Sequence, residues 1–158
     1  MLWLLLLLFS NHNADVLHAI RVVECGDVET PPDGAAGEIG PYQILRPYWE
    51  DSGIPGEYEM CREREYSERV VRAYMKRWCP KAWAAGDAET ISRVHNGGPR
   101  GAEKSSTISY WLKVEEVLQS RHDLHKVDHH QHISQQEKSR CYGGEGGWIL
   151  GDYGEGKI

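Results

Sequence analysis

Two carboxylates are the residues of this chain best suited to chemistry. Glu24 closes an amphipathic segment, and Asp33 follows it within a Pro-Asp-Gly turn. Two carboxyl groups that flank a sugar ring are the minimal equipment for glycoside hydrolysis. One donates a proton to the leaving oxygen, and the other attacks or stabilises the positive centre. On spacing alone, an exposed glutamate at a helix end and an ordinary turn aspartate would be the favoured interpretation of these two residues.

Two polar loops could border a cleft around these carboxylates. The first, residues 40–44 (Gly-Pro-Tyr-Gln-Ile), is predicted to be a tight turn into a strand, with Tyr42 and Gln43 facing a groove. The second, residues 95–101 (His-Asn-Gly-Gly-Pro-Arg-Gly), is predicted to end a helix, with a left-handed cap at Gly97. The pattern therefore predicts one cleft bordered by two loops that are distant in sequence.

Helical periodicity predicts the elements that would hold these loops. The first helix is capped by Asn13 and ends near Glu24, and the clearest helix covers residues 65–78. Two shorter helical patterns follow, and the first of them begins at Asp87. A short strand or hairpin is expected over residues 39–44. The fold class predicted is mainly α (α+β): a helical domain with a small β-hairpin element beside the cleft.

Composition describes a soluble globular chain. Its 158 residues are 40% hydrophobic and 27% charged, and the formal net charge of -6 argues against a nucleic-acid partner. Three regions are expected: an apolar segment at 1–12, a folded domain at 13–120 and a His- and Gly-rich tail at 121–158. The tail is predicted to be disordered because it cannot bury enough apolar surface to order itself.

The N-terminal segment is too short to span a bilayer. Residues 1–9 (MLWLLLLLF) resemble the apolar part of a secretory leader, although no Lys or Arg precedes them. We expect export, with an apolar extension packed on the domain as the alternative. In neither case is stable membrane insertion expected.

Neither the histidines nor the cysteines predict a metal site. The tail histidines lack a cysteine or carboxylate at the spacing of metal ligands, so neither a metal nor a cofactor is expected. The four cysteines fit no zinc motif, and no disulfide pairing is predicted for them. The cysteines are Cys25, Cys61, Cys79 and Cys141.

Several short motifs occur in one consistent order over roughly residues 16–118. They are Glu24-Cys25-Gly26, Asp33, Gly40-Pro41-Tyr42-Gln43-Ile44, Pro47-Tyr48-Trp49, Asp51-Ser52-Gly53, Val71-Arg72-Ala73-Tyr74-Met75, His95-Asn96-Gly97-Gly98-Pro99-Arg100-Gly101 and Tyr110-Trp111-Leu112-Lys113-Val114. In this combination the chain resembles the invertebrate-type (destabilase-like) lysozyme family of the lysozyme-like superfamily. With four cysteines it would be a disulfide-poor form of that family.

The resemblance implies a lysozyme-like catalytic domain that hydrolyses the β-1,4 bond of peptidoglycan between N-acetylmuramic acid and N-acetylglucosamine. Glu24 matches the family's general acid. Asp33, counted back from the Gly-Pro-Tyr-Gln-Ile motif, matches its second catalytic carboxylate. The loop between the two is shorter here than in the family, so Glu38 and Asp27 are alternatives. The residues implied to line the groove are Tyr42, Gln43, His95, Asn96, Gly97 and Gly98.

The partner implied is the peptidoglycan polysaccharide, bound by a monomer that is secreted or held in the cell envelope. Two other functions stay open. A lytic transglycosylase would use Glu24 as both acid and base, and a non-catalytic peptidoglycan-binding protein would keep only the fold. Some members of the family are associated with isopeptidase activity, for which Ser92 and His95 are at helical i,i+3 spacing.

Overall fold

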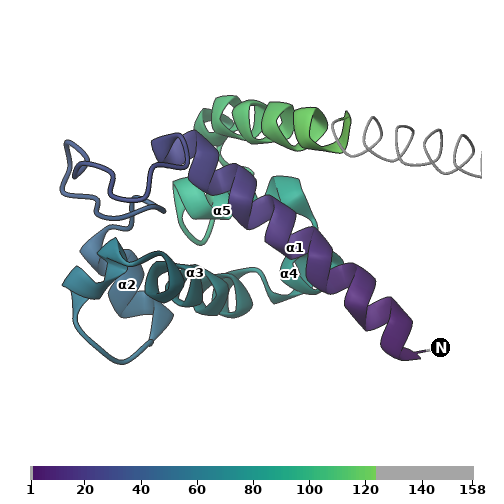
Figure 1. Ribbon diagram of the computed structural model, residues 1–158, viewed down its shortest axis with the longest axis horizontal. Helices are drawn as coiled ribbons and strands as arrows, with labels where there is room; N and C mark the ends of the chain where they lie inside the picture. Colours follow the sequence, from purple (N-terminus) through teal and green to yellow (C-terminus); the bar gives the residue numbers. More distant parts are fainter. Residues whose placement is uncertain (1, 124–158) are drawn as a thin grey trace, which may run out of the picture. The chain divides into compact units, whose positions relative to one another are not determined.

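The computed structural model describes residues 2–123, with side chains from residue 12 onward, and shows a mainly helical fold (Figure 1). The helices are α1 (Leu2–Cys25), α2 (Arg46–Ser52), α3 (Arg64–Trp78), α4 (Pro80–Ala85) and α5 (Ala88–Gly97), with short 3-10 turns η1 (Tyr58–Arg62), η2 (Gly101–Glu103) and η3 (Ser105–Thr107). A last helix occupies residues 108–123. The chain divides after Arg121, and all that follows concerns the first unit. The predicted tail lies almost entirely outside the described residues.

Helix α1 is longer than predicted. It begins at Leu2, so the prediction that Asn13 caps it is wrong. Leucine is a strong helix former, and no Gly or Pro interrupts the chain before Gly26. The Asn13 amide instead donates to the carbonyl oxygen of Trp83 in α4 at 2.9 Å. None of the helices within residues 2–123 is both long and apolar enough to cross a bilayer.

Helix α5 lies at the centre of the fold. It packs against α1, α3 and α4. As predicted, Asp87 caps it: the carboxylate accepts from the backbone N–H of Thr90 at 3.1 Å. The helix ends where Gly98 takes φ 78, one residue later than the predicted cap at Gly97. The core buried around α5 comprises Val16, Leu17, Ala19, Ile20, Val70, Val71, Met75, Ile91, Val94 and Val114.

The predicted β-hairpin amounts, in the described chain, to one antiparallel bridge between Ile39 and Ile44. Their two backbone hydrogen bonds are 3.1 and 2.9 Å long. Gly40 and Gln43 have φ angles of 74 and 44, which depart from the extended pleat and stop the ladder after one pair. An alanine Cβ at Gly40 would lie 1.8 Å from the carbonyl oxygen of Cys61, so this turn needs glycine.

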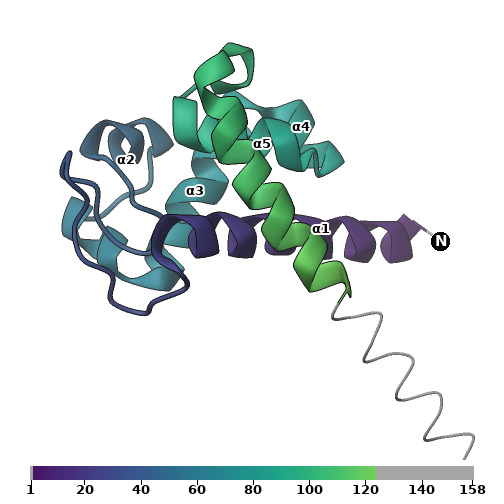
Figure 2. The ribbon, with the colours of Figure 1, turned by 90° about the horizontal axis from the view of Figure 1, so that it is seen from above.

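The loop between α1 and α2 contains this bridge. Figures 1 and 2 both show the loop beyond the carboxyl end of α1, beside α2. Tyr58 links the middle of this loop to its carboxyl end, because its hydroxyl lies 2.9 Å from the carbonyl oxygen of Gly37 and 2.6 Å from that of Ile44. Through this contact η1 holds the loop against the helical core and fixes one wall of a cleft.

Free thiols, not disulfides, occupy the described part of the core. Cys61 and Cys79 are buried and Cys25 is half-buried, and all three are free. Burial raises the pKa of Cys61 to about 12 and that of Cys79 to about 11, so both thiols stay protonated at neutral pH. Cys141 lies outside the described residues.

Candidate functional site

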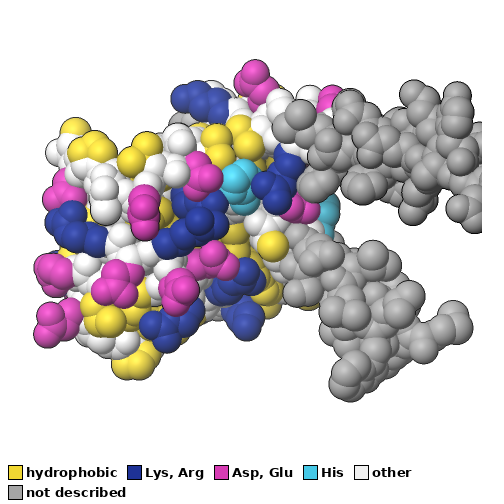
Figure 3. All heavy atoms as spheres, viewed as in Figure 1, with side chains coloured by type: hydrophobic (Ala, Val, Ile, Leu, Met, Phe, Trp, Pro, Cys, Tyr) yellow, Lys and Arg dark blue, Asp and Glu magenta, His cyan; other side chains and the backbone are white. Residues whose placement is uncertain are grey.

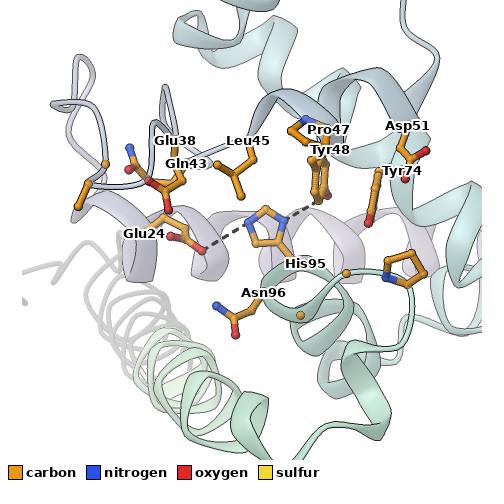
Figure 4. A pocket seen from close by; sticks show the side chains of 15 residues that line it. Glu24, Glu38, Gln43, Leu45, Pro47, Tyr48, Asp51, Tyr74, His95 and Asn96 are labelled. Carbon is orange, nitrogen blue, oxygen red and sulfur yellow. Dashed lines mark hydrogen bonds and ion pairs between the residues drawn. The ribbon is translucent and has the colours of Figure 1, made fainter.

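A cleft of about 550 Å³ opens where α1 ends, between the α1–α2 loop and the loop that follows α5 (Figure 4). Four helices (α1, α2, α3 and α5) and these two loops contribute its walls. The residues that line it are Glu24, Gly34, Ala35, Glu38, Gln43, Leu45, Pro47, Tyr48, Asp51, Tyr74, His95, Asn96, Gly97, Gly98 and Pro99. The cleft therefore contains Glu24 and five of the six residues that the sequence placed in the groove.

Two side chains contact the same carboxylate oxygen of Glu24, Oε1. The Tyr110 hydroxyl donates to its Oε1 at 2.7 Å, and Nε2 of His95 lies 3.5 Å from the same atom. None of the described residues hydrogen-bonds Oε2 of Glu24. The side chain is 18% exposed, so the carboxyl group is largely desolvated yet borders the cleft. This geometry leaves one carboxyl oxygen available to a ligand.

His95 joins Glu24 to a second tyrosine. Its Nδ1 lies 3.2 Å from the Tyr48 hydroxyl, and its side chain is only 4% exposed. Burial raises the pKa of Tyr48 and of Tyr110 well above the ordinary value of 10, so both phenols keep their protons. The Tyr48 hydroxyl and Nδ1 share this hydrogen bond, and the other ring nitrogen, Nε2, faces Glu24. His95 thus orients the carboxyl group as well as bordering the cleft.

The hydroxyl of Ser92 does not pair with His95. Ser92 is fully buried, and its Oγ donates to the carbonyl oxygen of Ala88, one turn earlier in α5, at 2.7 Å. This is the usual local bond of a helical serine. The Ser–His pair that isopeptidase chemistry would need is not formed.

Packing requires glycine at position 97, and the backbone conformation favours it at position 98. An alanine Cβ at Gly97 would lie 2.6 Å from Cγ2 of Thr107, and Gly98 takes the left-handed φ that ends α5. Both line the cleft together with Asn96. The chain therefore presents bare backbone along this wall, where a ligand can approach closely.

Tyr42 is not brought to the cleft. It is 0% exposed, and its hydroxyl points to Oε2 of Glu68 at 3.4 Å. Burial raises its pKa to about 12. Its neighbour Gln43 does line the cleft, and the Gln43 amide nitrogen donates to the carbonyl oxygens of Gly40 at 3.0 Å and Pro32 at 3.3 Å. The tight turn separates the two side chains: Tyr42 enters the core and Gln43 borders the cleft.

Of the three candidates for a second carboxylate, the cleft contains Glu38 alone. Asp33 lies outside the lining and accepts two hydrogen bonds from the Arg62 guanidinium, which holds the pKa of Asp33 below its usual value. Asp27 also lies outside the lining. Its ion pair with buried Arg21 lowers its pKa in the same way.

Among the site residues that sequence reasoning missed are three polar ones, Tyr48, Asp51 and Tyr110. Tyr48 and Asp51 line the cleft from α2, and Tyr110 reaches Glu24 from the last described helix. All three fall within motifs that carried the family resemblance. Their presence in those motifs was the available signal, but spacing could not show that they converge on Glu24.

Comparisons with known proteins agree with this architecture. Residues 17–117 match the Destabilase family. A lysozyme of Magallana gigas is 43% identical over 77 residues, which are 48% of this chain and 56% of that protein. Lysozyme 1 of Crassostrea virginica is 41% identical over 85 residues, which are 52% of this chain and 46% of that protein. The chain therefore spans about half the length of these two relatives.

A solved structure is similar in fold as well as in sequence. It is a chain of the crystal structure of Aeromonas hydrophila PliI in complex with Meretrix lusoria lysozyme, with a TM-score of 0.54 and 33% sequence identity. The similarity covers 65% of this chain and 87% of the other. The prediction of a lysozyme-like, mainly helical fold is confirmed.

Proposed function

The chain belongs to the destabilase family of invertebrate-type lysozymes, and from this membership we propose that it is a lysozyme. The reaction is hydrolysis of the β-1,4 bond between N-acetylmuramic acid and N-acetylglucosamine in peptidoglycan. Glu24 is its general acid. The observation that carries the proposal is the Glu24 carboxyl group, which borders the cleft with one oxygen held by Tyr110 and the other unoccupied by any described residue.

The contacts at Oε1 of Glu24 determine which oxygen carries the proton. Because Tyr110 and His95 both face Oε1, the proton of neutral Glu24 belongs on Oε2. Oε2 donates it to the glycosidic oxygen while the bond from that oxygen to the anomeric carbon breaks. Water then adds to the anomeric carbon and returns a proton to Glu24. Tyr110 and His95 keep the carboxyl group in one orientation through both transfers.

The chemistry of the lining suits sugar rings that carry hydroxyl and acetamido groups. Among the described residues no Lys or Arg lines the cleft, whereas Glu24, Glu38 and Asp51 contribute carboxylates and Gln43 and Asn96 contribute amides. An anionic phosphate ligand would be repelled there, and sugar hydroxyl and acetamido groups would find hydrogen-bond partners. On the face shown in Figure 3, basic and acidic side chains are intermixed, with no continuous basic patch for a nucleic acid.

The substrate also suggests where the protein acts. Peptidoglycan lies outside the cytoplasmic membrane, so we propose an extracytoplasmic site of action, secreted or in the cell envelope. We also propose that the protein acts as a monomer.

Product analysis tests the proposed reaction. Purified peptidoglycan is digested by the full chain in H₂¹⁸O, and the released fragments are weighed by mass spectrometry. A lysozyme leaves reducing muramic acid ends that carry one ¹⁸O from the solvent. Anhydromuramyl ends without ¹⁸O would identify a transglycosylase, and binding without release would identify a binding protein. Either of these results would contradict the proposal.

A further inference from the structure

We propose that Glu38, not Asp33, is the second catalytic carboxylate, and this assignment rests on the proposed lysozyme function. Figure 4 shows Glu24 and Glu38 at the same end of the cleft, Glu24 on α1 and Glu38 on the loop that faces it. Both line the cleft, whereas Asp33 does not. Glu38 is therefore placed to contact a sugar that also contacts Glu24.

Asp33 already has a partner. Both of its carboxylate oxygens accept from Arg62, one of them at 2.9 Å from Nη2. Paired oxygens of this kind form the strongest ordinary geometry between carboxylate and guanidinium. The Asp33 side chain is also 48% exposed, so water competes for any remaining capacity. To act on a sugar, Asp33 would have to break both bonds.

The loop holds Glu38 in place. The backbone N–H of Ala36 donates to Glu38 Oε2 at 3.0 Å, and the backbone N–H of Gly34 donates to the Glu38 carbonyl oxygen at 2.8 Å. The next residue, Ile39, forms the bridge to Ile44. Glu38 therefore projects from a short closed loop fixed on both sides, which is the support that a catalytic group requires.

Glycine at position 34 makes room for the Glu38 carboxyl group. A Cβ there would lie 2.2 Å from Glu38 Oε2 and 2.8 Å from Gln43 Oε1. A Cβ could be accommodated only if the Glu38 carboxylate moved, so glycine leaves the carboxylate the space that a Cβ would take. The N–H of Ala36 and the lack of a side chain at position 34 together favour this position of the Glu38 carboxylate.

The role of Glu38 is electrostatic. Glu24 gives its proton to the leaving glycosidic oxygen, which takes both electrons of the breaking bond, and the anomeric carbon becomes positive. Ionised Glu38 stabilises that charge without losing or gaining a proton. Water then bonds to the anomeric carbon and releases a proton to Glu24. The balance is one water consumed and one glycosidic bond broken, with both carboxyl groups restored.

Matched amide variants test the assignment. Glu38→Gln and Asp33→Asn each remove one charge with almost no change of shape, and Gln can still accept from the N–H of Ala36. We expect Glu38→Gln to lower kcat for release of reducing ends at least about 100-fold, since a preorganised charge is lost from the transition state. Asp33→Asn should keep kcat within about threefold of the wild type.

Two further measurements separate catalysis from folding. The melting temperature of Glu38→Gln should equal that of the wild type, and its KM should change far less than its kcat, because the charge acts in the transition state. A large loss of kcat in Asp33→Asn, alone or with a loss in Glu38→Gln, would overturn the assignment while leaving the lysozyme function intact. If the folded wild type releases no reducing ends, the proposed function fails and the assignment fails with it.

Discussion

Replacing Gly34 by alanine should damage catalysis while leaving the fold intact. The new Cβ would lie 2.2 Å from Glu38 Oε2, and ordinary contact begins at 3.4 Å. The Glu38 carboxylate must therefore move by about 1.2 Å, a shift that its flexible side chain can make. The backbone of Gly34 lies outside the left-handed region, so alanine itself is not strained there.

The expected loss of catalytic rate is large, whereas the expected change in stability is small. A misplacement of about 1 Å in a catalytic group can cost on the order of 100-fold in rate. We therefore expect kcat of Gly34→Ala to fall about 10- to 100-fold. Stability should be unchanged or slightly higher, because alanine has less conformational freedom than glycine in the unfolded chain.

Gly37→Ala is the matched control from the same loop. A Cβ at Gly37 meets nothing within 4 Å, but its φ of +88 is unfavourable for alanine. The expected cost is about 1–2 kcal/mol of stability, with kcat close to that of the wild type. Initial rates of reducing-end release and thermal melting are measured for both variants. The reasoning is refuted if Gly34→Ala melts like the wild type and keeps kcat within about twofold of it.

Three further outcomes are expected. Tyr58→Phe leaves two loop carbonyls without their shared donor, and urea unfolding should show a loss of about 1–3 kcal/mol; no loss would contradict the anchoring role. Tyr42→Phe should leave kcat unchanged, because Tyr42 is buried in the core. A large fall in kcat would show instead that Tyr42 acts in the groove. Burial raises the pKa of Cys61 to about 12 and of Cys79 to about 11, from 9. The unfolded thiols then ionise first as pH rises, so the free energy of unfolding should fall between pH 9 and 11 by roughly 1.4 kcal/mol per thiol per pH unit. A flat pH profile of stability would contradict their burial.

The helical elements were largely predictable from the sequence because their signals are local. Asp87 capped a helix as expected, and apolar spacing identified the buried stripe of α3. The prediction failed at Asn13. A capping residue was inferred there from its type, but the leucine-rich residues before it continue the same helix. A residue can cap a helix only where the helix begins or ends, and residue type alone does not fix that position.

The site was predictable in part. Glu24 and the loop after α5 were brought together as predicted, since each ends a helix of the same core. The second carboxylate could not be chosen from sequence, because the Arg62 that binds Asp33 comes from η1, far along the chain. Tyr42 was placed wrongly because two positive φ angles break the alternation of side chains in the turn.

Glu24→Gln tests the central claim most directly. Glutamine keeps the shape and can still accept from the Tyr110 hydroxyl, but it has no acidic proton to donate. Reducing-end release from purified peptidoglycan is measured for the variant and the wild type, each with its melting temperature. The account predicts an unchanged melting temperature and a fall in kcat of about 10²- to 10⁴-fold. Undiminished release by the folded variant would contradict it.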